Sequence, residues 1–266
     1  MAEIFLDVLE KNMIIKLGDG RKAENLFTGW QETMINSCLE NIMGDVYVDD
    51  AEQPLCAAAV LGDFAFLAGD ICREFADIRT YTDRNFMIMV PQNEAWAQLI
   101  EEVWGSRAKR VIRYAFQKEP DAFDEEHLRE VVRSLSDEFT IRLIDEDLYN
   151  VCKAESWSCD LVSQYADYEM YERLGAGVVI LKDGVPVSGA SSYSTYAGGI
   201  EIEIDTRKDY RRRGLAYTCG AALILECRKR NLYPSWDAQN TWSAALAQKL
   251  GYRFDHEYTA YEVQPE

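Results

Sequence analysis

The residues most able to do chemistry lie in one segment, residues 202–216, with the sequence I-E-I-D-T-R-K-D-Y-R-R-R-G-L-A. Gly214 tolerates positive φ and lets an anion approach the backbone closely, and Ala216 leaves the first turn of a following helix unobstructed. A helix N-terminus offers unpaired N–H groups and a partial positive charge. Full positive charges come from Arg211, Arg212 and Arg213. The segment therefore predicts an anion site, for which a pyrophosphate is the natural ligand.

The elements around this segment decide how much weight the short pattern carries. Taken alone, R-x-x-G-x-A is equally compatible with a helix end that bears a solvated arginine cluster. Ile200–Thr206, however, alternates isoleucine with acidic residues, which predicts a strand with one buried face. A long helix is expected at 214–230. A strand, an arginine-rich loop that contains a glycine, and a helix follow one another here. This order favours the anion site over a solvated arginine cluster.

The charge balance limits the classes of partner. The chain has 266 residues, 28 basic and 46 acidic, and a net charge of −18. Such a chain repels a phosphate backbone and anionic lipid, so we expect neither nucleic-acid nor membrane binding. Two histidines leave little room for a His-rich metal site, and no metal is expected. At 48% hydrophobic residues the chain can bury a core and is not a disordered polyanion.

The cysteines and the first residues favour a cytoplasmic protein. The start, MAEIFLDVLEKN, has acidic interruptions and no following apolar run, so we do not expect a signal peptide. The apolar stretch 54–61 is too short to span a bilayer. Seven cysteines without a C-x-x-C pair predict reduced thiols buried as small hydrophobic groups.

The pattern of elements divides near residue 135. We expect an N-terminal α/β domain over 1–135 and a second domain over 136–266. The first half predicts helices and short strands in which Gly62 and Asp63 form a hairpin turn. Its expected helices are 34–39, 94–104 and 124–134, and its expected strands are 45–49, 57–61, 64–68, 86–90 and 110–117.

The second half predicts a mixed sheet with helices. Its strands are expected at 140–144, 176–182, 185–194, 200–206, 234–237 and 251–263. Short helical pieces are expected before residue 172, and helices at 214–230 and 241–250. The fold class is α/β (α+β), with a mixed central sheet flanked by helices.

Beyond the anion loop, the sequence continues L-Y-P-S-W-D-A-x-N and then S-x-x-L-A-x-K-L-G-Y, as far as Tyr252. Together with T-x-x-x-Y-R-x-x-G-L-A, these motifs resemble the GCN5-related N-acetyltransferase (GNAT) superfamily, and in particular its zwittermicin-resistance branch. The motifs cover about 200–252, and the resemblance in fold extends over about 136–266. The first half shows no acyl-CoA motif. By the same resemblance it could be a degenerate copy of the fold.

The resemblance implies where acetyl-CoA, the expected co-substrate, would bind. The backbone of 212–216, which includes Leu215, would hold the pyrophosphate. The edge formed by Ile204, Asp205 and Thr206 would pair with the pantetheine arm like an added strand. Asn240 would contact the pantetheine or cysteamine end, and Ser243 stands where a small residue often faces the coenzyme.

The motifs specify the catalytic groups less closely than the coenzyme site. An alkylammonium has a pKa of about 10.4, so a carboxylate that accepts its proton lowers the barrier to attack. Glu203 is the preferred base, and Glu201 on the same strand face is the alternative. The tyrosine that commonly protonates the leaving thiolate is replaced by Ala247. Tyr252, Tyr193, Tyr196 or a water are the open alternatives for this acid.

The expected function is transfer of an acetyl group from acetyl-CoA to the primary amine of a small, cationic molecule by direct attack. A non-catalytic acyl-CoA-binding or regulatory module is the alternative, and the loss of the tyrosine at Ala247 supports it. A Cys-dependent hydrolase finds no local signature around any cysteine. The sequence leaves open whether the protein forms a homodimer.

Overall fold

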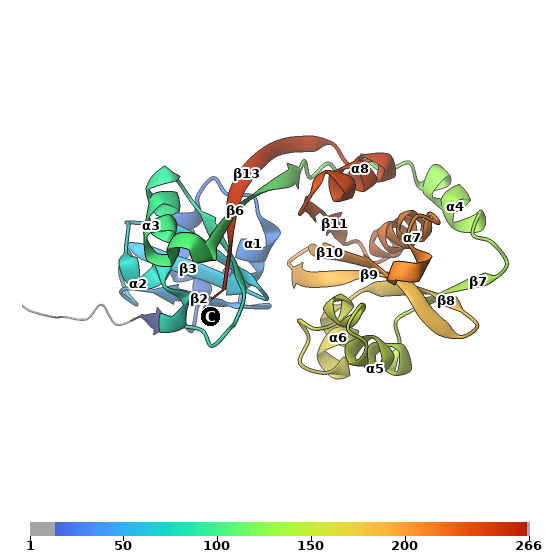
Figure 1. Ribbon diagram of the computed structural model, residues 1–266, viewed down its shortest axis with the longest axis horizontal. Coiled ribbons are helices and arrows are strands. Elements are labelled where there is room, and N and C mark those ends of the chain that lie inside the picture. The colour runs from blue at the N-terminus through green and yellow to red at the C-terminus, as the bar shows by residue number, and fades with distance from the viewer. Residues whose placement is uncertain (1–13, 265–266) are drawn as a thin grey trace, which may run out of the picture. The chain divides into compact units, whose positions relative to one another are not determined.

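The structure is a computed structural model that describes residues 14–264, and it forms two compact units (Figure 1). One unit comprises the described residues up to Val111 and those from Ala260 onward, and the other spans Ile112–Thr259. The chain passes between them within two strands, β6 (Ala108–Phe116) and β13 (Phe254–Val263). The division expected near residue 135 falls inside the second unit. The N-terminal segment expected not to be a signal peptide lies outside the described residues.

The first unit is a mostly antiparallel sheet with helices on both faces. Its strands follow the order β1, β2, β3, β4, β5 and the end of β13, and only β4 and β5 are parallel. The strands of this unit are β1 (Ile15–Lys16), β2 (Asp45–Val48), β3 (Cys56–Leu61), β4 (Phe64–Gly69) and β5 (Met87–Pro91). The helices are η1 (Gly20–Phe27), α1 (Thr33–Leu39), α2 (Arg73–Ala76), η2 (Ile78–Thr80), α3 (Glu94–Trp104) and η3 (Gly105–Arg107).

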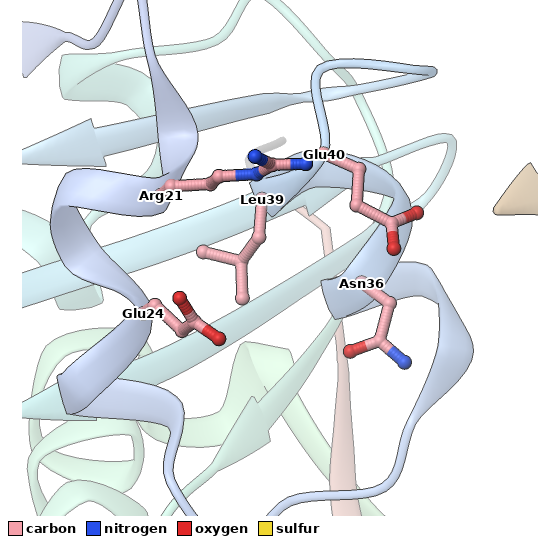
Figure 2. A pocket seen from close by; sticks show the side chains of 5 residues that line it. All are labelled: Arg21, Glu24, Asn36, Leu39 and Glu40. Atoms are coloured by element: carbon pink, nitrogen blue, oxygen red, sulfur yellow. The ribbon is translucent and has the colours of Figure 1, made fainter. Parts of the chain in front are cut away.

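Burial on both faces explains the apolar runs in β3 and β4. Trp96, Ile100 and Trp104 of α3 pack on one face against Leu67 and Met89. The turn between β3 and β4 contains Gly62 at φ 56°, as the predicted hairpin requires. On the surface of this unit, η1 and the end of α1 line a polar depression (Figure 2). Its lining residues are Arg21, Glu24, Asn36, Leu39 and Glu40.

The second unit contains a sheet in the order β11, β10, β9, β8, β7, in which only β10 and β11 are parallel. Its strands are β7 (Phe139–Leu143), β8 (Gly177–Lys182), β9 (Val185–Tyr196), β10 (Gly199–Thr206) and β11 (Tyr233–Ser235). A further short strand, β12 (Asp237–Ala238), pairs with β6 instead. The mixed α/β fold class is confirmed.

Helices cover both faces of the second unit's sheet, and α7 lies on the face opposite α5 and α6 (Figure 1). Ile200, Ile202 and Ile204 of β10 pack into the cores under α7. Because side chains alternate along a strand, the acidic residues of β10 lie on the other face. The helices are α4 (Glu125–Arg133), α5 (Glu146–Ala154), η4 (Cys159–Leu161), α6 (Tyr168–Leu174), η5 (Lys208–Tyr210), α7 (Leu215–Lys229) and α8 (Thr241–Leu250).

The strand expected at 234–237 is two strands with different partners. β11 pairs with β10, and after Trp236 the chain leaves that sheet, so that β12 pairs with β6. An ion pair fixes the new partner: Arg113 Nε of β6 donates to Asp237 Oδ1 at 2.6 Å. Tyr258 OH donates to Asp237 Oδ2 at 2.6 Å. The two charged side chains are 10% and 12% exposed, so the pair is nearly enclosed.

Removal of this carboxylate tests how strongly it holds β12 on β6. Burial tends to lower the pKa of Arg113, but Asp237 and Tyr258 outweigh it, so the guanidinium stays charged. Asp237→Ala should therefore lower the free energy of unfolding by about 3–5 kcal/mol, since a buried cation loses its partner. Urea denaturation measures this loss. The control Glu126→Ala, which removes an exposed partner of Arg133, should cost at most about 1 kcal/mol. Equal losses in the two variants would refute the role of the buried pair.

Candidate active site

The loop after β10 has the backbone geometry of an anion site. Arg212 and Gly214 have positive φ values of 62° and 79°, and Gly214 is the N-cap of α7. A Cβ built on Gly214 would meet no atom within 4 Å, so the space beside the helix start is open. A glycine is needed here both for its φ and for access to the backbone.

The start of α7 is not capped by a side chain, unlike the other long helices. Among the described α-helices of eight or more residues, every one except α7 has an Asn or Asp whose side chain accepts a backbone N–H. These caps are Asn93, Asp124, Asp145 and Asn240. Thr218 N donates to Gly214 O at 3.1 Å, which begins the helical pattern. The N–H groups of Leu215, Ala216 and Tyr217 precede that bond and are available to an external anion.

The arginines of the loop supply charge at the same place. Arg211 Nε donates to Thr206 O at 3.1 Å, which ties the loop to the end of β10. Arg213 lies 5.0 Å from the ring centroid of Tyr210. Within residues 14–264, Arg211, Arg212 and Arg213 form no ion pair with a carboxylate, and all three are exposed. Their charge is available to a ligand.

An open strand edge leads from this loop into the unit. The pairing of β10 with β11 ends at Glu201 and Ser235. From Ile202 to Thr206, β10 is paired with β9 on one side, and no described strand pairs with its other side. A ligand with amide groups could complete this edge in the manner of an added strand.

Glu203 lies on the acidic face of β10, next to the open edge, and is half-buried. Burial, together with the charges of Asp205 and Asp160, raises the pKa of Glu203 to about 8, and Arg113 opposes this shift. Burial also raises the pKa of Asp205, with Asp160 contributing in the same direction. Asp160 of η4 therefore belongs to the same acidic surface. No local sequence signal marks Asp160, because it lies more than forty residues before Glu203 in the chain.

Glu201 is in a more enclosed position, 6% exposed, and opposite Ser194 of β9. Its charge helps to raise the pKa of Tyr252 and Tyr233. Glu201 thus lies at the point where β10 and β11 still pair, whereas Glu203 lies just beyond it. Glu203 is therefore the more accessible of the two carboxylates to a substrate.

Tyr252 lies in the core and not on the open edge. It is 3% exposed, and its OH donates to Pro234 O at 2.6 Å. Burial raises its pKa well above the ordinary value for tyrosine. Tyr196 OH, in contrast, is 3.0 Å from Ser235 Oγ, at the last residue of β11 before the strands diverge.

Comparisons with known proteins identify this arrangement. A family model described as GNAT acetyltransferase matches residues 24–261. The chain belongs to the GNAT acetyltransferase family. It is an N-acetyltransferase, an enzyme that transfers acyl groups.

Three relatives illustrate the range of similarity to this GNAT acetyltransferase. A crystal structure of a GCN5-related N-acetyltransferase-like protein from Streptococcus suis is 49% identical, with a TM-score of 0.87 over 92% of this chain and 98% of that one. The uncharacterized N-acetyltransferase YdfB of Bacillus subtilis is 28% identical over 86% of this chain and 89% of its own. A tandem GNAT protein from the clavulanic acid biosynthesis pathway is 12% identical, covers 94% and 98%, and shares the fold at a TM-score of 0.58.

In this GNAT enzyme, Asn240 and Ser243 are part of one hydrogen-bonded group at the start of α8. Asn240 Oδ1 accepts from Ser243 N at 2.9 Å and so caps the helix. Ser243 Oγ accepts from Trp236 Nε1 at 3.1 Å. Trp236 is the residue at which the chain leaves β11 for β12, so the capped helix is fixed to the point of divergence. The sequence motif contained all three residues but gave no sign of this link.

Two features, a metal-binding group and a membrane-spanning helix, are absent from the described residues. Across residues 14–264, no group of three or more His, Cys, Asp or Glu side chains is arranged to hold a metal ion. No helix in the same range is long and apolar enough to cross a membrane.

The raised pKa of Glu203 has a consequence for stability. Its protonated form is favoured in the folded protein, so its stabilising contribution is full below about pH 4.5 and is lost as the pH rises through about 8. Glu203→Gln should therefore match the wild type at pH 5 and exceed its free energy of unfolding at pH 9 by roughly 1 kcal/mol or more. Urea denaturation at both pH values measures the difference. For the exposed control Glu257→Gln, the difference in free energy of unfolding from the wild type should be the same at both pH values. The same result for Glu203→Gln would refute the raised pKa of Glu203.

Proposed function

We propose that the protein transfers an acetyl group from acetyl-CoA to the primary amine of a small, cationic molecule by direct attack. The observation that carries this proposal is the continuity between the uncapped start of α7 and the open edge of β10. In this proposal the N–H groups of 212–216 hold the pyrophosphate. The pantetheine amides pair with Ile204, Asp205 and Thr206 and reach Asn240 and Ser243 at the start of α8.

Glu203 is the proposed base. The amine nitrogen attacks the thioester carbonyl carbon, a C–N bond forms, the C–S bond breaks, and Glu203 takes the amine proton directly or through water. An ordinary carboxylate is a weak acceptor for the proton of an alkylammonium, whose pKa is about 10.4. A carboxylate with a pKa of about 8 is better matched to that proton. Glu201 remains the alternative base, although its burial supports it less well.

The leaving thiolate needs no tyrosine at position 247. Ala247 lies on the buried face of α8, fully within the core. A thiol of ordinary pKa, about 8.5, is a tolerable leaving group as its thiolate. The hydrogen bond of Tyr252 to Pro234 O supports water or Tyr196 as the proton donor in preference to Tyr252.

The acceptor's charge is inferred from the acidic face of β10. Asp205 and Asp160 are close enough to raise the pKa of Glu203, and Asp160 also raises that of Asp205; a cation placed among these carboxylates would reduce this repulsion. The net charge of −18 attracts cations over a longer range.

The fold of the N-terminal half and the state of the cysteines support two further proposals. The likeness in fold to a tandem GNAT protein over 94% of this chain supports a degenerate GNAT-like origin for the N-terminal half. All seven cysteines are free thiols, which supports a reducing compartment such as the cytoplasm.

Acetyl-CoA binding is tested by filling the space at the helix start. Gly214→Trp should abolish binding of acetyl-CoA in isothermal titration calorimetry, because the indole would occupy the proposed pyrophosphate site. Gly184→Trp is a matched control, since Gly184 also has a positive φ, 83°, and open space around it. The control should bind acetyl-CoA as the wild type does. Equal binding by both variants would overturn the proposed coenzyme site.

The role of Glu203 is tested by the pH dependence of kcat/KM, measured as thiol release with a panel of amines. The wild type should show a rising limb with an apparent pKa near 8, because Glu203 must lose its proton. Glu203→Gln should lose this limb and at least about 100-fold in rate. Asp160→Asn should move the limb to lower pH, since Asp160 raises the pKa of Glu203, and should lower kcat/KM for a cationic amine by much less than Glu203→Gln does.

Full activity in Glu203→Gln would reject this residue as the base. Acetyl-CoA binding without thiol release for any amine would favour a regulatory acyl-CoA-binding module instead.

A further inference from the structure

Three helices of the second unit bring together a group of side chains beside the start of α7. His127 of α4, Tyr217 of α7 and Lys249 of α8 form this group. His127 Nε2 lies 2.9 Å from Tyr217 OH, and Lys249 Nζ lies 3.9 Å from the centroid of the Tyr217 ring. Tyr217 is half-buried, while the two basic side chains are exposed. We call these three residues the His127–Tyr217–Lys249 cluster.

The cluster holds positive charge without a matching carboxylate. Within the described residues, neither Lys249 nor His127 forms an ion pair. Two carboxylates beside His127 in the sequence have other partners: Glu125 pairs with Arg129 and Arg228, and Glu126 pairs with Arg129 and Arg133. A lysine left unpaired in a chain of net charge −18 is available to an external anion.

The position of the cluster specifies which anion. Tyr217 is the third residue of α7, so it lies on the same helical turn as the N–H groups proposed to hold a pyrophosphate. In CoA, a single ribose joins the pyrophosphate to the 3′-phosphate. An anion site one side chain away from the pyrophosphate site therefore lies where the 3′-phosphate can reach.

We propose that the His127–Tyr217–Lys249 cluster binds the 3′-phosphate of CoA and so distinguishes CoA from dephospho-CoA. This inference depends on the proposed use of acetyl-CoA. Lys249 supplies a full positive charge, and the hydrogen-bonded pair of Tyr217 and His127 supplies one further donor to the phosphate oxygens. The contact between His127 and Tyr217 holds the phenol in place on the side of α7 that faces α4 and α8.

Isothermal titration calorimetry with CoA and with dephospho-CoA tests this proposal, because the two ligands differ only by the 3′-phosphate. The wild type should bind CoA at least about tenfold more tightly, the effect of one charge-assisted contact. Lys249→Gln should weaken CoA binding by about tenfold and leave dephospho-CoA binding unchanged. Tyr217→Phe and His127→Gln should each reduce the preference for CoA over dephospho-CoA, by a smaller factor than Lys249→Gln does.

The control Lys229→Gln removes an exposed lysine at the far end of α7, and it should keep the full preference for CoA. A preference that survives in Lys249→Gln but disappears in Arg213→Gln would overturn the proposal and assign the 3′-phosphate to the loop arginines. Equal binding of both ligands by the wild type, or an equal loss of both in Lys249→Gln, would also overturn it. Failure of the wild type to bind either ligand would instead reject the coenzyme on which both proposals depend.

Discussion

The separation of β11 from β10 is the constraint on which the rest of the site depends. Backbone N–H and C=O groups of a buried strand need partners, and an open edge is normally closed by the neighbouring strand. Here β11 stops pairing with β10 after Ser235, and Asp237 is held on β6 by Arg113. This nearly enclosed ion pair thus keeps β12 paired with β6 and away from β10. The edge of β10 beyond Glu201 stays open next to Glu203, and a ligand's amide groups can take the place of the missing strand.

Charge is organised locally against the overall balance of the molecule. A net charge of −18 would oppose a polyanionic ligand, yet screening limits each charge to about 8 Å at physiological salt. At the start of α7 a ligand's phosphates would meet uncapped N–H groups and unpaired arginines. On the other face of β10, Glu203, Asp205 and Asp160 create a region of opposite sign. One strand and the loop that follows it therefore separate an anion site from an acidic surface.

The parts of the fold encoded by local patterns were predictable. The alternation in Ile200–Thr206 gave β10, and Gly214 marked the start of α7, because backbone preference and one-sided burial act on adjacent residues. Features set by distant contacts were not predictable. The strand expected at 234–237 divides at Trp236 because Asp237 pairs with Arg113 of β6, which lies more than a hundred residues away in the chain. The unit boundary at 111 and 112, the return of β13 to the first unit, and the approach of Asp160 to β10 are non-local in the same way.

The acidic surface and the base are physically coupled in the proposed reaction. Burial and two neighbouring carboxylates keep Glu203 protonated up to a pH near 8. A cationic acceptor bound among Asp205 and Asp160 would offset their repulsion and so favour the ionised form of Glu203. Linkage requires the converse as well, so that ionised Glu203 strengthens binding of the cation. The carboxylates that make Glu203 reluctant to ionise in the free enzyme are thus the groups whose effect the acceptor removes. The base would then gain its charge when its substrate is in place.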